Sequence, residues 1–409
     1  MSQPSVSPDL PELDPPAGSA APIAAAVASV EAELIALRRD IHAHPELSWE
    51  EVRTTELVGA RLTEAGLALG PVPTETGLVC DLGSGDPMVA LRADLDALRL
   101  DDVKDVPYRS TVPGVAHACG HDVHTAAAVG AALGLAQVLR PGEGRVRIVF
   151  QPAEETIPSG ARPLAEAGLV DGARAVYALH CDPHLEVGQV GVSPGPITSA
   201  ADMVEIRLSG PGGHTARPHR TVDLVNVAAR LAVDLPSSLD RLTDPRDGVN
   251  LTFGAILSGE APNVIPTGAV LRGSLRATGR AGWEDAARLL PGLVASVAEP
   301  LGATWELDHR VGAPPVENDP WATRLLADAA REVARPGGVV PTRQSGGGED
   351  FSWFLERVPG AFARLGITRP GAEPMDIHSG AFDVDEDAIA LGARLLAGVA
   401  LATLAAPAP

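Results

Sequence analysis

The segment HACGHDVHT (117–125) gathers side chains that bind metal ions or move protons. Cys119 and His121 stand two residues apart in a loop that contains glycine, so a thiolate and an imidazole can face one ion. One carboxylate and one further histidine would complete a set that suits zinc or a neighbouring divalent transition metal. The alternative is a polar helix start with a buried, inert Cys119, in which Asp122 caps the helix and His124 lies on its exposed first turn.

A pair of adjacent carboxylates follows an apolar segment further along the chain. QPAEE places Glu154 and Glu155 directly after RVRIVF (145–150). Adjacent side chains outside a helix point apart, so one carboxylate can bind a metal while the other takes a proton from a water molecule. The alternative is a solvated acidic turn. The position directly after an apolar strand favours the functional interpretation.

Residues of the same kinds stand where other predicted strands end. MVALRADLDAL closes with Asp94 and Asp96, whose i,i+2 spacing puts both side chains on one face, and ARAVYALH ends at His180. In open α/β sheets, sites form beyond the carboxyl ends of the strands. A late histidine, His378 in DIHSGAF, could supply a further ligand. We therefore expect these side chains and the HACGHDVHT loop to converge on one pocket.

The segments between these residues predict an α/β fold with a mainly parallel sheet covered on both faces. Apolar periodicity predicts a helix from Ile23 that ends before Pro45, on which His42 and His44 are surface residues. Strands at 88–98, 145–150 and 173–180 alternate with an alanine-rich helix at 122–139.

The pattern changes near residue 199. It then reads strand, helix, strand, strand, helix, strand, the ferredoxin-like order, at 203–210, 222–235, 248–259, 269–279, 282–301 and 304–311. A helix, a glycine-rich loop, a strand and a last helix follow. This order predicts four parts of the chain: a disordered lead (1–22), a catalytic domain in two pieces (23–198 and 311–409) and an inserted domain (199–310).

The inserted domain offers three polar candidates. Consecutive glycines before His214, in GPGGHTARPH, suggest a tight loop that holds the imidazole out. Asn263 in APNVIPTG and Arg276 on the following strand suit recognition of a carboxylate, which arginine grips with a bidentate fork. The alternative is a turn-forming asparagine and a surface arginine. The glycine-rich SGGGEDF lacks the ending of a phosphate-binding loop, and its two acids would oppose an anion, so we expect a close-packed turn near the site.

The composition argues against several classes of function. A formal net charge of −21 repels phosphate backbones and anionic membranes, and only 3% of the residues are aromatic. No apolar run comes near the ~20 residues that a membrane helix needs. We therefore expect no nucleic-acid partner and no membrane. Three cysteines in 409 residues do not form a disulfide framework and fit a reducing compartment, here the cytoplasm.

The chain resembles a family of metallopeptidases, the aminoacylase–carboxypeptidase amidohydrolases. Their branch contains hippurate hydrolase, N-acyl-amino-acid amidohydrolases and auxin–amino acid conjugate hydrolases. The resemblance covers the chain from about Arg38 to the C-terminus. It is carried by RRDIHAHPE, LRADLDAL, HACGHDVHT, FQPAEE, ALH, GPGGHTARPH, NVIP, GGGEDF and the late His378. It implies a zinc-peptidase-like catalytic domain with an inserted ferredoxin-like lid.

The resemblance also implies a site. Two divalent ions per subunit (zinc, manganese, nickel or cobalt) would be held by Cys119, His121, Glu155, His180 and His378. Glu154 would be the general base, and Asp96 would orient a ligating imidazole. The lid residue His214 would hold the oxyanion, often in the partner subunit's site, while Asn263 and Arg276 would grip the substrate's carboxylate. The implied substrates are N-acyl amino acids or similar small amides, and the implied assembly is a homodimer through the lid.

Other functions remain open from the sequence. The nearest is a dipeptidase or carboxypeptidase that uses the same two-metal site. A non-catalytic metal-binding protein is disfavoured by Glu154 beside Glu155, because a storage site needs no general base. A redox protein that uses Cys119 would be revealed by rapid labelling of the metal-loaded form, since a coordinated thiolate reacts slowly.

Overall fold

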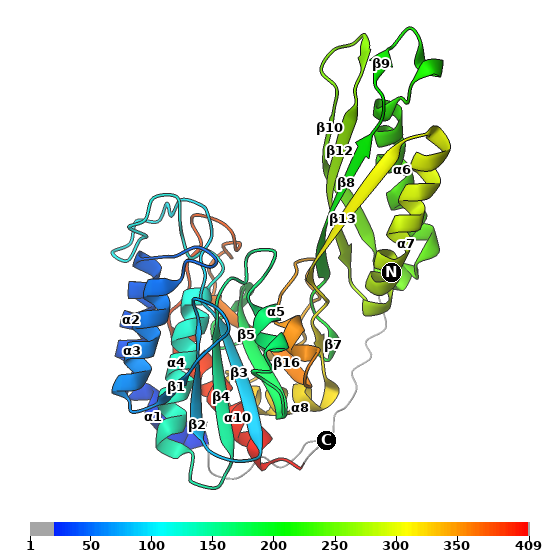
Figure 1. Cartoon of the computed structure of the whole chain (residues 1–409). Coiled ribbons are helices and arrows are strands. Elements are labelled where there is room, and N and C mark those ends of the chain that lie inside the picture. Colours follow the sequence, from blue (N-terminus) through cyan, green and yellow to red (C-terminus); the bar gives the residue numbers. More distant parts are fainter. Residues whose placement is uncertain (1–19, 408–409) are drawn as a thin grey trace.

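The computed structural model describes residues 20–407, which form a large α/β body and a smaller body that stands away from it (Figure 1). The predicted disordered lead falls mainly outside the described residues. Its last three residues, 20–22, are already helical, because helix α1 begins at Ala20 rather than near Ile23.

An eight-stranded sheet forms the centre of the large body, and its four middle strands run parallel. Antiparallel pairs join β1 to β2, β2 to β4 and β16 to β6. Because the four middle strands run parallel, the mainly parallel sheet predicted from the sequence is confirmed. In sheet order the strands are β1 (Ala68–Gly70), β2 (Leu78–Gly83), β4 (Arg145–Gln151), β3 (Met88–Asp94), β5 (Ala173–Glu186), β16 (Gly360–Thr368), β6 (Val190–Gly191) and β15 (Val339–Val340).

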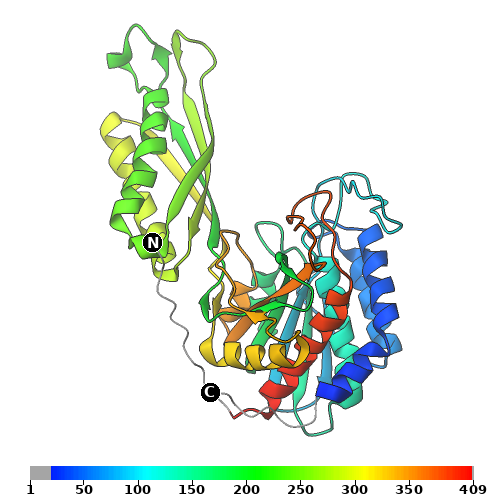
Figure 2. The same cartoon turned by 180° about the vertical axis from the view of Figure 1, so that it is seen from behind.

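Helices cover both faces of this sheet, but unequally (Figures 1 and 2). Val89 and Leu91 of β3 point into the larger core, and Met88 and Ala90 point into the smaller one. The larger core is formed by α1 (Ala20–Ala28), α2 (Glu31–Ala43), α3 (Val52–Glu64), α4 (His121–Val138), α8 (Pro320–Val333) and α10 (Asp387–Ala405). The smaller core lies under α5 (Ala161–Glu166) and α9 (Ser352–Leu355).

Two predictions about the helices of this body are wrong. The single N-terminal helix is two helices, broken at Ser29 and Val30, because the Ser29 hydroxyl donates to the carbonyl of Ala26 and competes with the helical pattern. The expectation that no apolar run reaches membrane length fails for α10, which is long and apolar enough by composition. This helix packs mostly inside the protein, against α4 and α8, as the core helix of an α/β body does.

The prediction that His42 is a surface residue is also wrong. His42 is fully buried, and its Nδ1 atom lies 2.7 Å from Oδ2 of Asp122. The buried guanidinium of Arg38 donates to the same oxygen at 2.7 Å. Asp122 therefore does not cap α4 but ties its first turn to α2, because a buried carboxylate needs charged or hydrogen-bonding partners. His44 remains partly exposed, with 43% of its side chain accessible.

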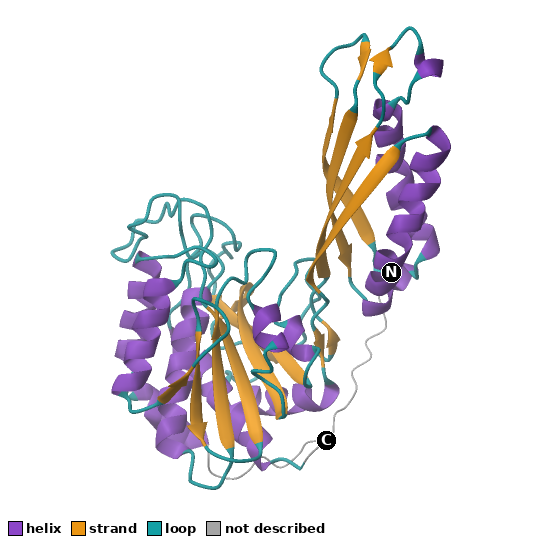
Figure 3. Cartoon of the chain, viewed as in Figure 1, coloured by secondary structure: helices purple, strands orange, loops and turns teal. Residues whose placement is uncertain are grey.

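The smaller body has the ferredoxin-like order that its sequence predicts, and Figure 3 shows two helices against one face of its sheet. The predicted fold class is confirmed. The strands lie in the order β10 (Asn250–Ser258), β12 (Gly268–Ala277), β8 (Ala200–Ser209) and β13 (Thr304–Ala313), all antiparallel, under α6 (Leu224–Leu242) and α7 (Arg280–Ala298). Short pairs join β9 (Gly213–His214) to β11 (Val264–Ile265) and β7 (Gly195–Pro196) to β14 (Glu317–Asn318).

Candidate metal centre

The HACGHDVHT loop turns sharply just before α4. Gly120 has a φ angle of 89°, and a Cβ atom at this position would lie 2.6 Å from Sγ of Cys181. Only glycine fits both requirements. The turn places Cys119 at the end of the loop and His121 in the first turn of α4, both buried. Cys119 contacts His180 of β5, and His121 contacts Asp96, which follows β3.

His121 and His180 turn the same ring nitrogen, Nε2, toward the space beside Cys119. Nδ1 of His121 donates to the backbone oxygen of Asp96 at 2.9 Å, and Nδ1 of His180 donates to the backbone oxygen of Cys181 at 2.7 Å. The Nε2 atom of each ring is therefore the one left to bind a metal ion. His180 lies inside β5, which continues beyond the predicted end because it pairs with β16 as far as Glu186.

Asp96 is positioned to fix His121. Its Oδ1 atom lies 3.3 Å from Nδ1 of His121, and its Oδ2 atom accepts from the hydroxyl of Ser48 at 2.7 Å and from the backbone N–H of Glu155 at 2.9 Å. One carboxylate thereby connects the imidazole of α4 to the QPAEE turn after β4.

His378 reaches the same place from the C-terminal part of the chain. Its Nε2 atom lies 3.3 Å from Oε1 of Glu155. Its backbone has a φ angle of 60°, and its N–H donates to the oxygen of Ala118 at 2.7 Å. A non-glycine residue in this left-handed conformation needs surrounding contacts to hold it. The bond to Ala118 thus ties this loop to the segment that carries Cys119.

The five predicted ligands fit a pair of metal ions. Sγ of Cys119 lies 3.3 Å from Nε2 of His180, the ~3–4 Å separation of two ligands on one ion. Nε2 of His121 and Oε1 of Glu155 are buried without a hydrogen-bond partner. Cys119 belongs to two ligand groups, one with His121 and His180 and one with Glu155 and His378, which suits a thiolate shared by two ions.

The charges of the protein alone favour a bound cation beside Cys119. Burial, and then Glu155, raise the pKa of Cys119 well above its usual range, and burial and Arg364 lower the pKa of His180. A metal ion supplies the positive charge that a buried thiolate needs. Burial opposes protonation of His121, but Asp94 and Asp96 outweigh it and raise the pKa of His121.

His124 and Asp94 are held away from a ligand role. The alternative in which His124 lies on an exposed turn is wrong, since only 2% of it is accessible. Its Nδ1 atom donates to Oδ1 of Asp94 at 2.7 Å and its Nε2 atom accepts from the N–H of Cys181 at 2.9 Å, so both ring nitrogens are used. Asp94 also accepts from Arg92 at 2.6 Å. His117 is buried too, and burial lowers its pKa to about 3, so it stays neutral.

Glu154 faces a cluster of acids that the sequence reasoning gave no role. Its carboxylate lies within 4.8 Å of those of Glu349 and Asp350, which belong to the glycine-rich SGGGEDF loop. Arg92 bridges the loop to the sheet, with Nη2 3.1 Å from Glu349 and 2.8 Å from Asp350. Burial, then Glu349 and Glu155, raise the pKa of Glu154 well above its usual range. The signal that could have found the cluster is Arg92, because a buried arginine in a strand needs carboxylate partners.

The three candidates of the inserted domain do not lie together. Arg276 is at the base of β12, where it lines a cavity of about 530 Å³ with Glu154 and His378. His214 and Asn263 are exposed at the far tip, where β9 pairs with β11 (Figure 1). They are joined to each other through the bond from the N–H of Thr215 to the oxygen of Asn263 at 3.2 Å, but not to the candidate metal ligands.

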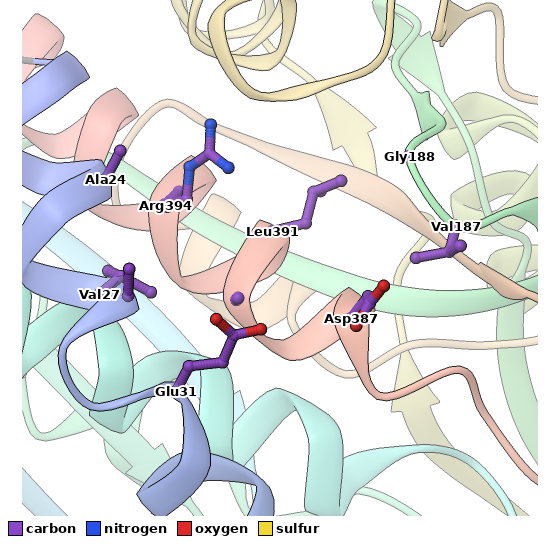
Figure 4. A pocket seen from close by; sticks show the side chains of 10 residues that line it. Ala24, Val27, Glu31, Val187, Gly188, Asp387, Leu391 and Arg394 are labelled. Carbon is purple, nitrogen blue, oxygen red and sulfur yellow. The ribbon is translucent and has the colours of Figure 1, made fainter.

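A second cavity, of about 360 Å³, lies away from these residues. It is formed where α1 and α10 meet the turn at Val187 and Gly188 (Figure 4). Glu31 and Arg394 point into it, but it contains none of the predicted site residues.

Comparisons with known proteins agree with this geometry. Residues 90–402 match the model of peptidase family M20/M25/M40. N-acetyl-L-cysteine deacetylase of Bacillus subtilis (strain 168) is 37% identical over 369 residues, with 89% of this chain and 86% of that protein covered. The crystal structure of the Bacillus subtilis YXEP protein, described as a dinuclear metal binding peptidase from the M20 family, has a TM-score of 0.77 at 33% identity and covers 91% of this chain and 98% of its own.

One relative is much longer than this chain. A putative glutamate–cysteine ligase 2-3 of Rhodococcus jostii (strain RHA1) is 46% identical over 368 residues, which are 90% of this chain but 46% of that protein. The chain therefore spans about half the length of this relative.

Proposed function

Because the chain belongs to the peptidase family M20/M25/M40 and is a metal-dependent hydrolase of amide bonds, we propose that it removes the acyl group from N-acyl amino acids or similar small amides. The observation that carries the proposal is the convergence of Cys119, His121 and His180 with Glu155 and His378, beside a carboxylate suited to act as a base.

We assign these five residues as ligands of two divalent ions. Cysteine and histidine favour the softer members of the set zinc, manganese, nickel and cobalt. When bound, such ions polarise the amide carbonyl as Lewis acids and make a water molecule acidic enough to lose its proton near neutral pH. Asp96 positions His121, because its carboxylate and backbone oxygen both lie against Nδ1 of that ring.

Glu154 acts as the general base in this proposal. It takes a proton from the water that attacks the carbonyl carbon and then passes that proton to the leaving nitrogen. Its raised pKa supports the assignment, because a carboxylate that binds protons more tightly is a stronger base. Arg276 grips the substrate's carboxylate from the wall of the same cavity.

The position of His214 and Asn263 supports a homodimer. At the tip of the lid they serve the partner subunit's site, His214 by donating a hydrogen bond to the oxyanion and Asn263 by contacting the substrate's carboxylate. The lid also has an unpaired edge strand, β10, on which Ile256 and Leu257 are 47% and 56% exposed. Such an edge is a natural place for contact with a second copy.

We also propose that the enzyme works in the cytoplasm. Its three cysteines are buried and unpaired, a state that a reducing compartment maintains. Recovery of the protein with a periplasmic or secreted marker on cell fractionation would contradict this.

A substrate panel tests the proposed function. The metal-loaded enzyme is given N-acetyl, N-benzoyl and indoleacetyl amino acids, and dipeptides with the same C-terminal residues. We expect kcat/KM to be at least about tenfold higher for the N-acyl amino acids, because a dipeptide's ammonium group would be repelled by the nearby metal ions. The chelated protein serves as the control. Faster cleavage of dipeptides would replace the proposal with a dipeptidase, and no cleavage of any amide would refute it.

A further inference from the structure

Arg364 stands beside the candidate metal ligands without a partner. It lies on β16, directly across the parallel strand pair from His180. Among the described residues its guanidinium forms no hydrogen bond or ion pair, and it lies over the ring of Phe362, 5.4 Å from the centroid. The other buried arginine of this region differs in this respect, since Arg92 contacts Asp94, Glu349 and Asp350. Glu349, Asp182 and Glu154 act on this charge without contacting it. A partly buried guanidinium with no anion in contact is costly, so the structure leaves a contact to be filled.

Arg364 lies where two cavities adjoin. One is the cavity of about 530 Å³, which is lined by Glu154 and by the proposed ligands Cys119, Glu155, His180 and His378. The other, of about 630 Å³, extends past Pro341 and His184. Arg364 lines both, together with His180, Ser345 and Ile377. A ligand that fills the first cavity can therefore extend a polar group past this arginine into the second.

The first cavity thus carries two arginines on different elements, Arg276 from the lid strand β12 and Arg364 from the central strand β16. Nη1 of Arg276 is buried and has no hydrogen-bond partner. One carboxylate, that of an amino acid, can satisfy one of these arginines. The other charged side chains that line the cavity near the reaction centre are acidic. They would repel a second anionic group of the substrate unless a positively charged side chain bound that group.

We propose that Arg364 binds a second negatively charged group, so that the preferred substrates are amides with two carboxylates, one held by Arg276 and one by Arg364. This inference rests on the proposed amide hydrolysis and narrows its substrate class. The second carboxylate belongs either to the amino-acid side chain or to the far end of the acyl group. Both give the bidentate arginine–carboxylate contact that a guanidinium favours.

Two matched substrate pairs test the proposal with the unaltered, metal-loaded enzyme. N-acetyl-L-glutamate is compared with N-acetyl-L-glutamine, and N-succinyl-L-alanine with its neutral terminal amide. In each pair the shape is kept and one negative charge is removed. We expect kcat/KM to be about 10- to 100-fold higher for the charged member of at least one pair, mainly through KM, as befits one charge-assisted contact. The pair that shows the preference identifies where the second carboxylate lies.

Variants then assign the preference to Arg364. In Arg364→Gln the ratio of the two kcat/KM values should fall to near one, whatever the absolute rates. Arg364→Lys should keep part of the preference for the charged substrate, because lysine keeps the positive charge but cannot form the bidentate contact. Arg369→Gln is the matched control, since this exposed arginine pairs with Asp385 outside both cavities. It should leave the ratio unchanged.

The outcomes separate this inference from the function on which it rests. If the unaltered enzyme cleaves the neutral amides as well as the charged ones, the role of Arg364 is refuted and the amide hydrolysis stands. A rate loss in Arg364→Gln that is equal for both members of a pair also refutes it, because that pattern indicates a general effect on His180. If none of the four amides is cleaved, both proposals fail.

Discussion

Replacing Glu154 with glutamine should lower kcat for an N-acyl amino acid by about a thousandfold or more, within the range that a general base contributes. Glutamine keeps the size of the side chain but cannot accept the proton from the attacking water. The metal content should not change, because the assigned ligand is the neighbouring Glu155 and not Glu154. Oε1 of Glu155 is buried without a hydrogen-bond partner. Steady-state kinetics and elemental analysis on the same preparation measure both quantities.

Glu155→Gln is the matched comparison, one residue away and equal in charge. It removes a proposed ligand, so metal content and activity should fall together. Glu166→Gln, on the exposed ion pair with Arg162, should change neither. If Glu154→Gln retained more than about a tenth of the activity, Glu154 would not be the base. A large loss of metal in this variant would make it a ligand instead.

His214→Ala should lower kcat by about 100- to 1,000-fold, the usual effect of removing one donor to an oxyanion. The sharper result concerns mixed dimers. His214→Ala and Glu154→Gln chains are co-expressed with different affinity tags and purified through both. In each mixed dimer one site then combines an intact Glu154 with His214 of the partner subunit, and the other site lacks both. We therefore expect about half of the wild-type activity per dimer, although each variant alone is nearly inactive.

This expectation separates the possible arrangements of the lid. If His214 served the site of its own chain, both sites of the mixed dimer would be defective and the activity would stay low. If no mixed species passed through both affinity steps, the proposed homodimer itself would be wrong. Asn263→Ala paired with Glu154→Gln provides a second combination that should be restored in the same way, since Asn263 lies beside His214 at the lid tip.

Much of the fold follows from local patterns. The strands at β3 and β4 and the helix α4 lie where apolar runs and alanine-rich periodicity predict them, and the strand and helix order of the inserted body is ferredoxin-like as expected. Such patterns depend on neighbours in sequence. The break at Ser29 cannot be predicted in this way, because the periodicity of apolar residues continues through it and does not reveal the contact of the Ser29 hydroxyl with Ala26.

The buried charges could not be predicted in the same way. His42, Asp122 and His124 are of residue types that usually lie on the surface. Their burial depends on partners that are distant in sequence, such as Arg38, which donates to Asp122 from 84 residues away. Arg92 with Glu349 is a longer case of the same kind. Polar residues become core residues only when the fold supplies a partner, and one sequence does not list its own contacts.

The candidate site shows the same division. The motifs indicate which residue types could bind metal, and the fold brings Cys119 within reach of His180 in one ligand group and of His378 in another, from separate segments of the chain. Residue order alone could not tell that Arg276 lies at the base of the lid while His214 lies at its tip, because the two are 62 positions apart on different strands of one small domain.

A metal titration tests the central claim most directly. The purified protein is stripped with a chelator and reloaded stepwise with zinc, manganese, nickel or cobalt, while bound metal per chain and hydrolysis of an N-acyl amino acid are followed together. We predict no activity in the stripped protein, binding of two ions per chain, and recovery of activity as the sites fill; Cys119→Ser should weaken the binding of both ions because Cys119 belongs to both ligand groups. Full activity in the metal-free protein would contradict the account. So would metal sites that fill without any change in activity.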